Sequence, residues 1–392
     1  MTSNTDRWRI IAVFVLQALG MGAIQTRIPD VQLALGLNDA QLGLALMGLP
    51  AGALSVFLFS SGIIERFGPR RTVLTFLPIQ TIAAAAIAVA PDFWSMTALF
   101  FVMGVGSAVT NIAMNVEADR IEAASSRRVM NTCHGAWSVG FLAVALLGSP
   151  IRGLGISSAL HMAIAAPLVL GAMLLVVLPM RDAPERAHSG SAGRRRLAWP
   201  TLMTLALVAF GLGGELLEGA ARSWSIIFLR DSFAVPAWVE SLALPALLAT
   251  MAIGRLLADR QIDRHGPVLV ARVMAAIAFA GLCAVVFSAN AAMALAGFGL
   301  VGLGICVLYP LMLSGAAGIG DRPAAENVAA MTLVVQIISL GAPLLIGAVA
   351  EGFGIRFAFG MLLPLLALSW AMAGILAPKP QPIRQSSVTP PA

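Results

Sequence analysis

Charge is the scarcest property of this sequence. Only 11% of its 392 residues are Asp, Glu, Lys or Arg, whereas 59% are hydrophobic. A soluble domain carries about 25% charged residues, so this chain cannot cover a water-facing surface and must lie in lipid. Lysine is nearly absent, since Lys379 is the only one. The formal net charge of +6 comes from arginines in separate short loops, without a basic face or an aromatic platform, which argues against nucleic-acid binding.

Cysteines and catalytic motifs are also few. Cys133, Cys283 and Cys306 lie in apolar segments without metal-ligand spacing, and their odd number argues against a disulfide framework. We interpret them as buried small hydrophobic residues. The sequence contains no P-loop with its lysine, no Ser-His-Asp order and no His-Glu-x-x-His motif. We therefore expect neither an enzyme nor an ATP-driven pump, and no cofactor or metal.

What the sequence does contain is twelve apolar segments, each about as long as the 20 residues that a helix needs to cross a bilayer. Backbone groups in lipid must be paired internally, so these segments are predicted to be helices. We predict an all-α membrane protein with twelve transmembrane helices in two pseudo-symmetric bundles of six, the first helix being retained rather than cleaved. The approximate cores are residues 8–28, 40–61, 72–90, 93–116, 131–150, 157–179, 199–229, 236–258, 267–288, 291–317, 326–350 and 355–376.

The basic residues predict the sidedness of the protein. Of the 25 lysines and arginines, 20 lie at the N-terminus or after even-numbered spans; the remaining five are Arg27, Arg152, Arg222, Arg230 and Arg356. The positive-inside rule then places both termini in the cytoplasm. We expect the protein to lie in the inner membrane of the cell. We expect an N-terminal bundle (1–180), a cytoplasmic linker (181–197), a C-terminal bundle (198–377) and a disordered cytoplasmic tail (378–392).

One short basic turn occurs twice. The stretch from Gly62 to Arg71 contains an acid, an arginine, a glycine and a proline, and the stretch from Arg260 to Pro267 repeats this core. The equivalent acids, Glu65 and Asp263, are 198 residues apart in a chain of 392. The chain is therefore interpreted as two copies of one unit.

Twelve spans, the central linker and the doubled turn resemble the major facilitator superfamily of secondary transporters. That family's signature between spans 2 and 3 is roughly Gly-x-x-x-Asp-Arg-x-Gly-Arg-Arg. The first turn matches it with Glu in place of Asp and one residue fewer, whereas the second has Val268 and Leu269 in place of the basic pair. The resemblance covers essentially the whole chain. The matching residues are Gly62, Glu65, Arg66, Gly68, Arg70 and Arg71 in the first turn, and Asp263, Arg264 and Gly266 in the second.

A narrower resemblance is to rhizopine-permease-like proteins, which are related to sugar–proton symporters. It rests on Arg27-Ile28-Pro29, Ala113-Met114-Asn115, His134-Gly135-Ala136-Trp137-Ser138, Glu218-Gly219-Ala220-Ala221 and Trp224-Ser225. That subgroup usually has an acid just before the span-7 tryptophan, where this chain has Ser223. The resemblance implies a sugar, polyol or inositol-like solute. Any role that the acid has in the subgroup is in question for this chain, because Ser223 takes its place.

Span 7 carries the residues that are most costly to bury. Glu215, Glu218 and Arg222 are spaced to share one helix face, and a charge near the bilayer centre costs roughly 2.5–3.5 kcal/mol. Either they line a water-filled cavity that binds solute or protons, or they form an internal ion pair. A carboxyl group in an apolar site can exchange a proton near neutral pH. Glycines at 211, 213 and 214 are expected to let this helix bend.

Other polar residues in the spans are further candidates for a cavity. Asn111 and Asn115 fit either solute binding or helix packing. His134 is a candidate for proton transfer; Trp137 either stacks on a sugar-like ring or belongs to an aromatic belt. Arg27 fits an entrance or an interfacial anchor beside Asp30. The remaining candidates are Gln25, Tyr309 before the kink signal Pro310, and Gln336.

The doubled turn has two interpretations. Its arginines can bond to neighbouring helix ends and hold one conformation as a latch, or they can only set topology. For the whole chain we predict a monomeric secondary transporter that moves a small polar solute by alternating access, with protons as the coupling ion. The alternatives are efflux of amphiphilic or cationic compounds by the same fold, and a non-transporting membrane sensor or scaffold.

Overall fold

The computed structural model describes residues 4–56, 59–125, 129–184 and 199–377. Within these ranges the chain is helical and contains no strand, which confirms the predicted all-α class. Most of the linker predicted at 181–197, and the whole tail predicted at 378–392, lie outside the described residues.

The first half contains α1 (Asn4–Gln25), α2 (Ile28–Ala34), α3 (Asp39–Leu46), α4 (Gly48–Val56), α5 (Ser60–Phe67), α6 (Pro69–Ile87), α7 (Phe93–Ser125), α8 (Met130–Gly153) and α9 (Ser158–Val177). The second contains α10 (Leu202–Ser232), α11 (Ala237–Glu240), α12 (Ala243–His265), α13 (Pro267–Val286), α14 (Ala291–Ile305), α15 (Leu308–Ala317), α16 (Ala324–Phe353), α17 (Ile355–Gly360), α18 (Leu363–Met372) and the 3₁₀ turn η1 (Ala373–Leu376).

The predicted spans are recovered. Among the described residues, 11 helical segments are long and apolar enough to cross a membrane. The span predicted at 72–90 corresponds to α6, which is not one of the 11; it has 19 residues, and Arg70 and Arg71 lie in its first turn. It packs against α1, α7 and α9 and completes the first bundle.

Several spans are broken rather than continuous. The span predicted at 291–317 is divided between α14 and α15 at Cys306 and Val307, just before the expected kink at Pro310. A proline cannot donate a hydrogen bond to the carbonyl four residues before it, which here belongs to Cys306. Arg255 Nε of α12 donates to that carbonyl oxygen at 3.5 Å. The break therefore frees the carbonyl oxygen of Cys306 for a polar contact with Arg255 inside the second bundle.

α10 is one continuous helix from Leu202 to Ser232, and the bend expected at its glycines stays a prediction. These glycines allow close packing. A Cβ at Gly213 would lie 2.7 Å from the backbone of Leu365, and a Cβ at Gly211 would lie 2.3 Å from the sulfur of Met312. Their small size therefore brings α10 against α15 and α18.

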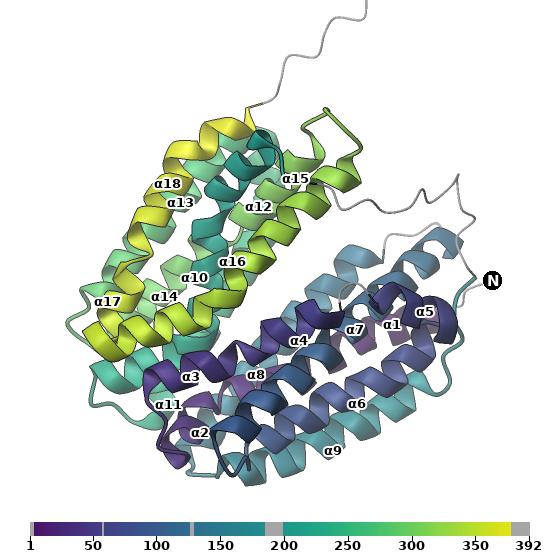
Figure 1. Cartoon of the computed structure of the whole chain (residues 1–392), viewed down its shortest axis with the longest axis horizontal. Helices are drawn as coiled ribbons and strands as arrows, with labels where there is room; N and C mark the ends of the chain where they lie inside the picture. Colours follow the sequence, from purple (N-terminus) through teal and green to yellow (C-terminus); the bar gives the residue numbers. More distant parts are fainter. Residues whose placement is uncertain (1–3, 57–58, 126–128, 185–198, 378–392) are drawn as a thin grey trace, which may run out of the picture.

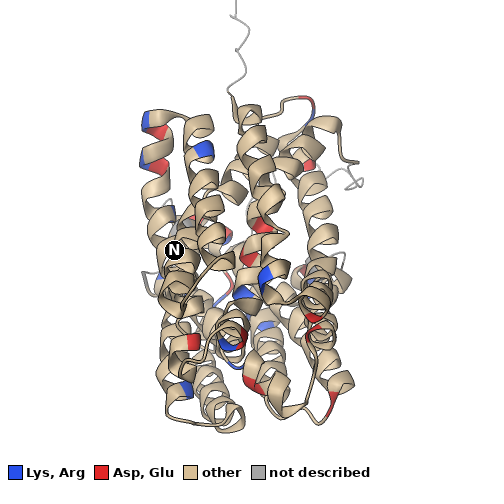
Figure 2. Ribbon diagram, turned by 90° about the vertical axis from the view of Figure 1, so that its left-hand side faces the viewer, with Lys and Arg blue, Asp and Glu red and all other residues tan. Residues whose placement is uncertain are grey.

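The two halves form two bundles that are side by side at one end of the molecule and diverge toward the other (Figure 1). The adjoining end is formed by α2, α3, α11 and α17; we call it the closed end. The diverging end, called the open end, carries α5 and α15, together with the start of α1 and η1. Most of the ribbon carries no charged residue, as expected for helices in lipid (Figure 2).

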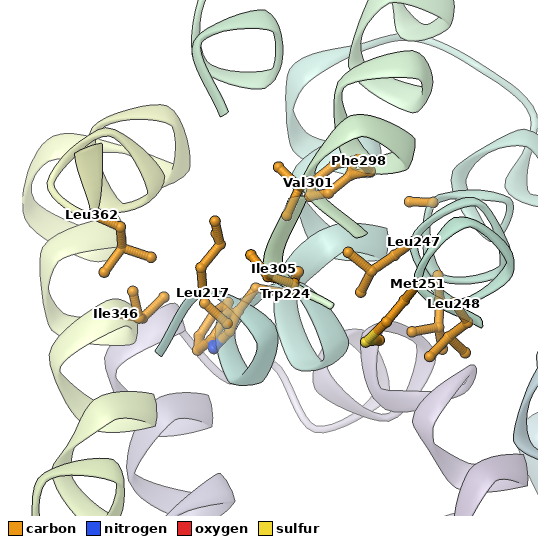
Figure 3. Close-up of a cluster of buried hydrophobic side chains, with 14 of the residues drawn as sticks. Leu217, Trp224, Leu247, Leu248, Met251, Phe298, Val301, Ile305, Ile346 and Leu362 are labelled. Atoms are coloured by element: carbon orange, nitrogen blue, oxygen red, sulfur yellow. The ribbon is translucent and has the colours of Figure 1, made fainter. Parts of the chain in front are cut away.

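The second bundle has a continuous apolar core. Leu247, Leu248 and Met251 of α12 pack with Phe298 and Ile305 of α14 (Figure 3). All of these side chains are buried, so this core fixes the position of α10, which lies between α12 and α16 and carries the charged residues of span 7.

The closed end depends on a contact between two glycines. A Cβ at Gly347 of α16 would lie 2.3 Å from the carbonyl oxygen of Asp39 and 3.0 Å from the Cα of Gly43 in α3. Backbone atoms of the two halves thus touch directly. In addition, the backbone N–H of Asp39 donates to Glu351 Oε2 at 3.0 Å.

Replacing Gly347 with alanine should force α3 and α16 apart. We expect a loss of about 1–3 kcal/mol in the stability of the closed end, measured as a lower melting temperature of the purified protein. Gly352→Ala is the matched control in the same helix, because a Cβ there meets nothing within 4 Å. Equal melting temperatures for the two variants would contradict the close contact.

The repeated turn has the same backbone geometry in both halves. Gly68 has φ 76° and ψ 157°, and Gly266 has φ 79° and ψ 156°. Each glycine ends one helix and precedes a proline that begins the next. Because positive φ strains other residues, the structure explains why glycine stands at both positions.

Candidate functional site

The charged residues of α10 meet a second arginine from α12. Arg222 Nη2 donates to Glu218 Oε1 at 2.6 Å, which confirms the predicted ion pair. Arg255 Nη2 donates to Glu218 Oε2 at 3.5 Å. Glu218 is therefore held between two guanidinium groups. Arg255 is one of the 20 basic residues that were counted after even-numbered spans. In the structure it belongs to α12 and does not lie in a loop.

Arg222 also reaches the first half. Its guanidinium lies 5.6 Å from the ring centre of Trp137 and 5.3 Å from that of Phe141, both in α8. The two rings are stacked, with centres 5.2 Å apart. Cations are attracted to aromatic faces at such distances, so this contact joins the two bundles at a charged residue.

Behind Trp137 lies a chain of polar side chains within the first bundle. Trp137 Nε1 donates to Gln17 Oε1 of α1. Gln17 Nε2 in turn lies 3.2 Å from both Gln80 Oε1 of α6 and Ser107 Oγ of α7. The indole is thereby fixed in orientation, which leaves its face available to a cation or a ring.

A pocket of about 190 Å³ lies between the two halves, and we call it the inter-half pocket. Gln25 of α1 and Pro50 of α4 line it from the first half; Glu215, Arg222 and Ser339 are among the residues that line it from the second. Trp224 and Ile346 border it from the apolar core (Figure 3). A second small cavity of about 10 Å³ lies against Trp137, Arg222 and Arg255.

Four buried polar atoms that belong to residues of this pocket have no hydrogen-bond partner among the described residues. They are Gln25 Oε1, Arg222 Nε, Trp224 Nε1 and Ser339 Oγ. Buried polar groups are normally paired, because an unpaired one costs about 1–3 kcal/mol. The residues that line this pocket therefore contribute one unpaired acceptor, two unpaired donors and an unpaired hydroxyl group.

Glu215 also lines this pocket and forms no ion pair or hydrogen bond with the described residues. It lies one helical turn from Glu218, whose carboxylate is occupied by two arginines. The two glutamates of one helix face thus have different environments.

Asn111, Asn115 and His134 form a separate group. Asn115 Nδ2 donates to the carbonyl oxygen of Asn111 at 2.7 Å, and His134 Nε2 lies 3.1 Å from Asn115 Oδ1. None of the three lines the inter-half pocket. Tyr309 is half-buried in α15, facing Thr332, and Gln336 is exposed on α16, one turn from Ser339. Of the predicted cavity residues, the structure brings together Gln25, Trp137, Glu215, Glu218 and Arg222.

Arg27 lies at the closed end, away from the pocket, in a group of charges that we call the closed-end network: Arg27, Asp30, Arg152 and Glu240. Its side chain is 1% exposed and donates to Asp30 Oδ2 at 3.0 Å. This contact agrees with the interpretation of Arg27 as an anchor beside Asp30. Arg152 of α8 donates to Asp30 Oδ1 at 2.8 Å and, across the interface between the halves, to Glu240 Oε2 of α11 at 2.5 Å. Arg27 Nε also donates to His161 Nδ1 at 2.9 Å.

Arg70 in the first repeated turn binds the end of a neighbouring helix in its own half. Its Nε and Nη2 donate to the carbonyl oxygens of Val177 and Leu178 at 3.1 and 2.6 Å, and its backbone N–H donates to Asp182 Oδ1 at 2.7 Å. These carbonyls terminate α9 and carry partial negative charge. Among the remaining latch candidates, Gly62, Glu65, Arg71, Asp263 and Arg264 are exposed, and Arg66 lies over the ring of Phe67.

Replacing Arg70 with alanine should lower the free energy of unfolding by about 2 kcal/mol, since two charge-assisted hydrogen bonds to α9 are lost. Arg71→Ala removes the same charge from the next residue, which is exposed, and should change the stability by less than about 0.5 kcal/mol. Thermal unfolding in detergent measures both. Equal losses would mean that only net charge matters at this turn.

Several residues of the site were not predicted from the sequence. Gln17, Gln80 and Ser107 are single polar residues within apolar segments, which was the available signal. Arg152, His161 and Glu240 stand near predicted span ends, where charged residues are ordinary. Their roles depend on which helix ends meet across the two halves, and this is a property of the tertiary structure.

Comparison with known proteins agrees with this architecture. The chain is 27% identical over 372 residues to the uncharacterized transporter y4wD of Sinorhizobium fredii, covering 95% of this chain and 97% of that protein. It is 28% identical over 345 residues to the membrane protein MosC of Rhizobium meliloti, covering 87% and 83% of the two chains. Each alignment spans both bundles.

A solved structure shows the same fold. A bacterial homolog of the human lysosomal transporter Spinster, in an inward-facing and unoccupied conformation, superposes with a TM-score of 0.76 at 14% identity, covering 96% of this chain and 98% of that one. The sequence pattern described as Major Facilitator Superfamily matches residues 10–339. The chain therefore belongs to the major facilitator superfamily of multi-pass membrane transporters.

Proposed function

We propose that this protein is a secondary transporter that moves a small polar solute, of the sugar, polyol or inositol-like class, by alternating access and in symport with protons. The observation that carries the proposal is the inter-half pocket, which both bundles line and whose lining residues include unpaired donors and an unpaired acceptor. Hydroxyl groups donate and accept hydrogen bonds, so a polyhydroxylated solute can satisfy both kinds of group.

The charges of the pocket support a solute without a large net charge. One acid and one base, Glu215 and Arg222, line the pocket, and the stacked rings of Trp137 and Phe141 lie beside Arg222. Sugar-like rings combine an apolar face with polar edges. The resemblance to sugar–proton symporters agrees with this class.

We assign the closed end to the periplasm and the open end to the cytoplasm of an inner membrane. The distribution of basic residues supports this assignment, and the described ends of the chain lie at the open end (Figure 1). The structure then corresponds to an inward-open state. Transport requires that the closed-end network separates while the open ends approach, which is the rocking of two halves around a fixed site.

Proton coupling is assigned to Glu215. Glu218 is occupied by two arginines, whereas Glu215 faces the same pocket without an ion-pair partner among the described residues. A carboxyl group in that situation can take up a proton without breaking an ion pair. Its protonation state can then change with the state of the pocket.

Glu215→Gln should abolish proton-driven accumulation while it preserves solute exchange. Proteoliposomes loaded with unlabelled sugar or polyol would be assayed for counterflow and, separately, for accumulation under an inward proton gradient. We expect normal counterflow and at least a tenfold loss of accumulation. Glu218→Gln, the matched control, breaks both ion pairs and should reduce counterflow as well. If Glu215→Gln accumulated the solute under the gradient at the wild-type level, the assignment of proton coupling to Glu215 would be wrong.

A further inference from the structure

Arg272 is an arginine on the outer surface of the second bundle. It is exposed on α13 and forms no ion pair or hydrogen bond with the described part of the chain. Its guanidinium lies over the ring of Trp370 in α18, 5.5 Å from the ring centre. The two helices are side by side on the side of this bundle that faces away from the first (Figure 1). The surrounding medium at this surface is therefore lipid.

A groove of about 280 Å³ lies between α13 and α18, and the Trp370 ring that Arg272 covers is part of its lining. Its floor contains the small residues Ala275, Ala276 and Ala367, and Phe279 and Trp370 flank it. Arg272, Ala276 and Phe279 are four and then three residues apart, so they lie along one face of α13. The groove therefore extends about 10 Å from the guanidinium toward the middle of the membrane, at 1.5 Å per residue.

The position of Arg272 requires an anion. It lies five residues inside α13, which begins at Pro267, or about 7.5 Å from the helix end. An arginine at such a depth extends toward the interface and is stabilised by a partner of opposite charge. A phosphate diester accepts two parallel hydrogen bonds from a guanidinium. The acyl chain attached to it would fill the apolar groove below.

We propose that Arg272, Trp370 and this groove bind one anionic phospholipid, in the leaflet that contains the turn between α12 and α13. A phosphatidylglycerol headgroup carries one negative charge and no cation, so it neutralises Arg272. A phosphatidylcholine headgroup brings its own cation, which competes for the ring of Trp370. This site is separate from the inter-half pocket, so the proposal does not depend on the transport function.

The test is native mass spectrometry of the purified protein after exchange into detergent with equal amounts of phosphatidylglycerol and phosphatidylcholine. We expect a 1:1 adduct with phosphatidylglycerol retained at least tenfold more than the phosphatidylcholine adduct. Thermal unfolding should show a higher melting temperature with phosphatidylglycerol only, because a ligand that binds the folded state stabilises it.

Two variants separate the headgroup from the acyl chain. Arg272→Ala should abolish the preference, whereas Arg264→Ala, which removes an exposed arginine from the preceding turn, should keep it. Ala276→Leu should fill the groove and weaken retention while Arg272 remains in place. Equal retention of both lipids, an unchanged preference in Arg272→Ala, unchanged retention in Ala276→Leu, or a second copy of the chain in place of the lipid adduct would each overturn the proposal.

Discussion

Replacing Arg152 with alanine should open the closed end of the protein. Arg152 is the one member of the closed-end network that bonds to carboxylates of both halves, Asp30 and Glu240. Its side chain is 6% exposed, so its removal leaves the largely buried Glu240 without an ion-pair partner among the described residues, whereas Asp30 keeps Arg27. Breaking such a pair costs about 3–5 kcal/mol. We expect the state in which this end is closed to lose stability, relative to the state in which it is open, by at least about 100-fold.

Labelling of Ser149→Cys with a membrane-impermeant maleimide would measure this opening. Ser149 is 3% exposed, and its hydroxyl donates to the carbonyl oxygen of Trp238 in the other half at 2.7 Å. Cys283 would be replaced by alanine in both backgrounds. The label should then react about 100-fold faster in the Arg152→Ala background than in the protein that keeps Arg152.

The matched control is Arg356→Ala. Arg356 lies at the same end, and its hydrogen bonds within the described residues go to Val286 and Ser288 of its own half. Its removal should lower the melting temperature without faster labelling of the cysteine at position 149. If both arginine variants were labelled at the same rate, the network would not hold the halves together.

Replacing Arg222 with alanine should remove most of the affinity for the solute. Arg222 borders both cavities, pairs with Glu218 and contacts the Trp137 and Phe141 rings. Truncating an arginine at the centre of a binding site costs about 2 kcal/mol or more, so we expect the dissociation constant to rise at least about 30-fold. Thermal-shift titration with the sugar or polyol selected by a screen measures the change.

Arg255→Ala provides the comparison within the same site. Its guanidinium is 3.5 Å from Glu218 and its side chain is 38% exposed. Exposed ion pairs contribute about 0–1 kcal/mol, so this variant should weaken binding by about fivefold at most. A larger effect for Arg255→Ala than for Arg222→Ala would contradict the arrangement of the pocket.

The sequence was sufficient to predict the positions of the apolar spans, because hydrophobic length directly reflects the thickness of the bilayer. It also predicted the Glu218–Arg222 pair and the two glycine turns, since these depend on spacing within one element. Pro310 indicated the break before α15. The close packing at the glycines of α10 was not predicted, because the sequence does not show which neighbouring helix a small residue receives.

Contacts between the halves were beyond the sequence. Arg222 over Trp137 joins residues of spans 7 and 5, and Arg152 with Glu240 joins the end of span 5 to the start of span 8. Neither pairing follows from periodicity, because each requires the relative position of the two bundles. Arg255 shows the same limit: by sequence it was counted with the loop arginines, and the fold turns it toward Glu218.

The most direct test of the account is uptake of radiolabelled sugars and polyols into proteoliposomes that contain either the wild-type protein or Arg222→Ala. The account predicts that at least one compound enters wild-type vesicles faster than protein-free vesicles, that an inward proton gradient drives its accumulation, and that Arg222→Ala abolishes this entry. The absence of any such flux with folded wild-type protein, or equal flux with Arg222→Ala, would contradict it.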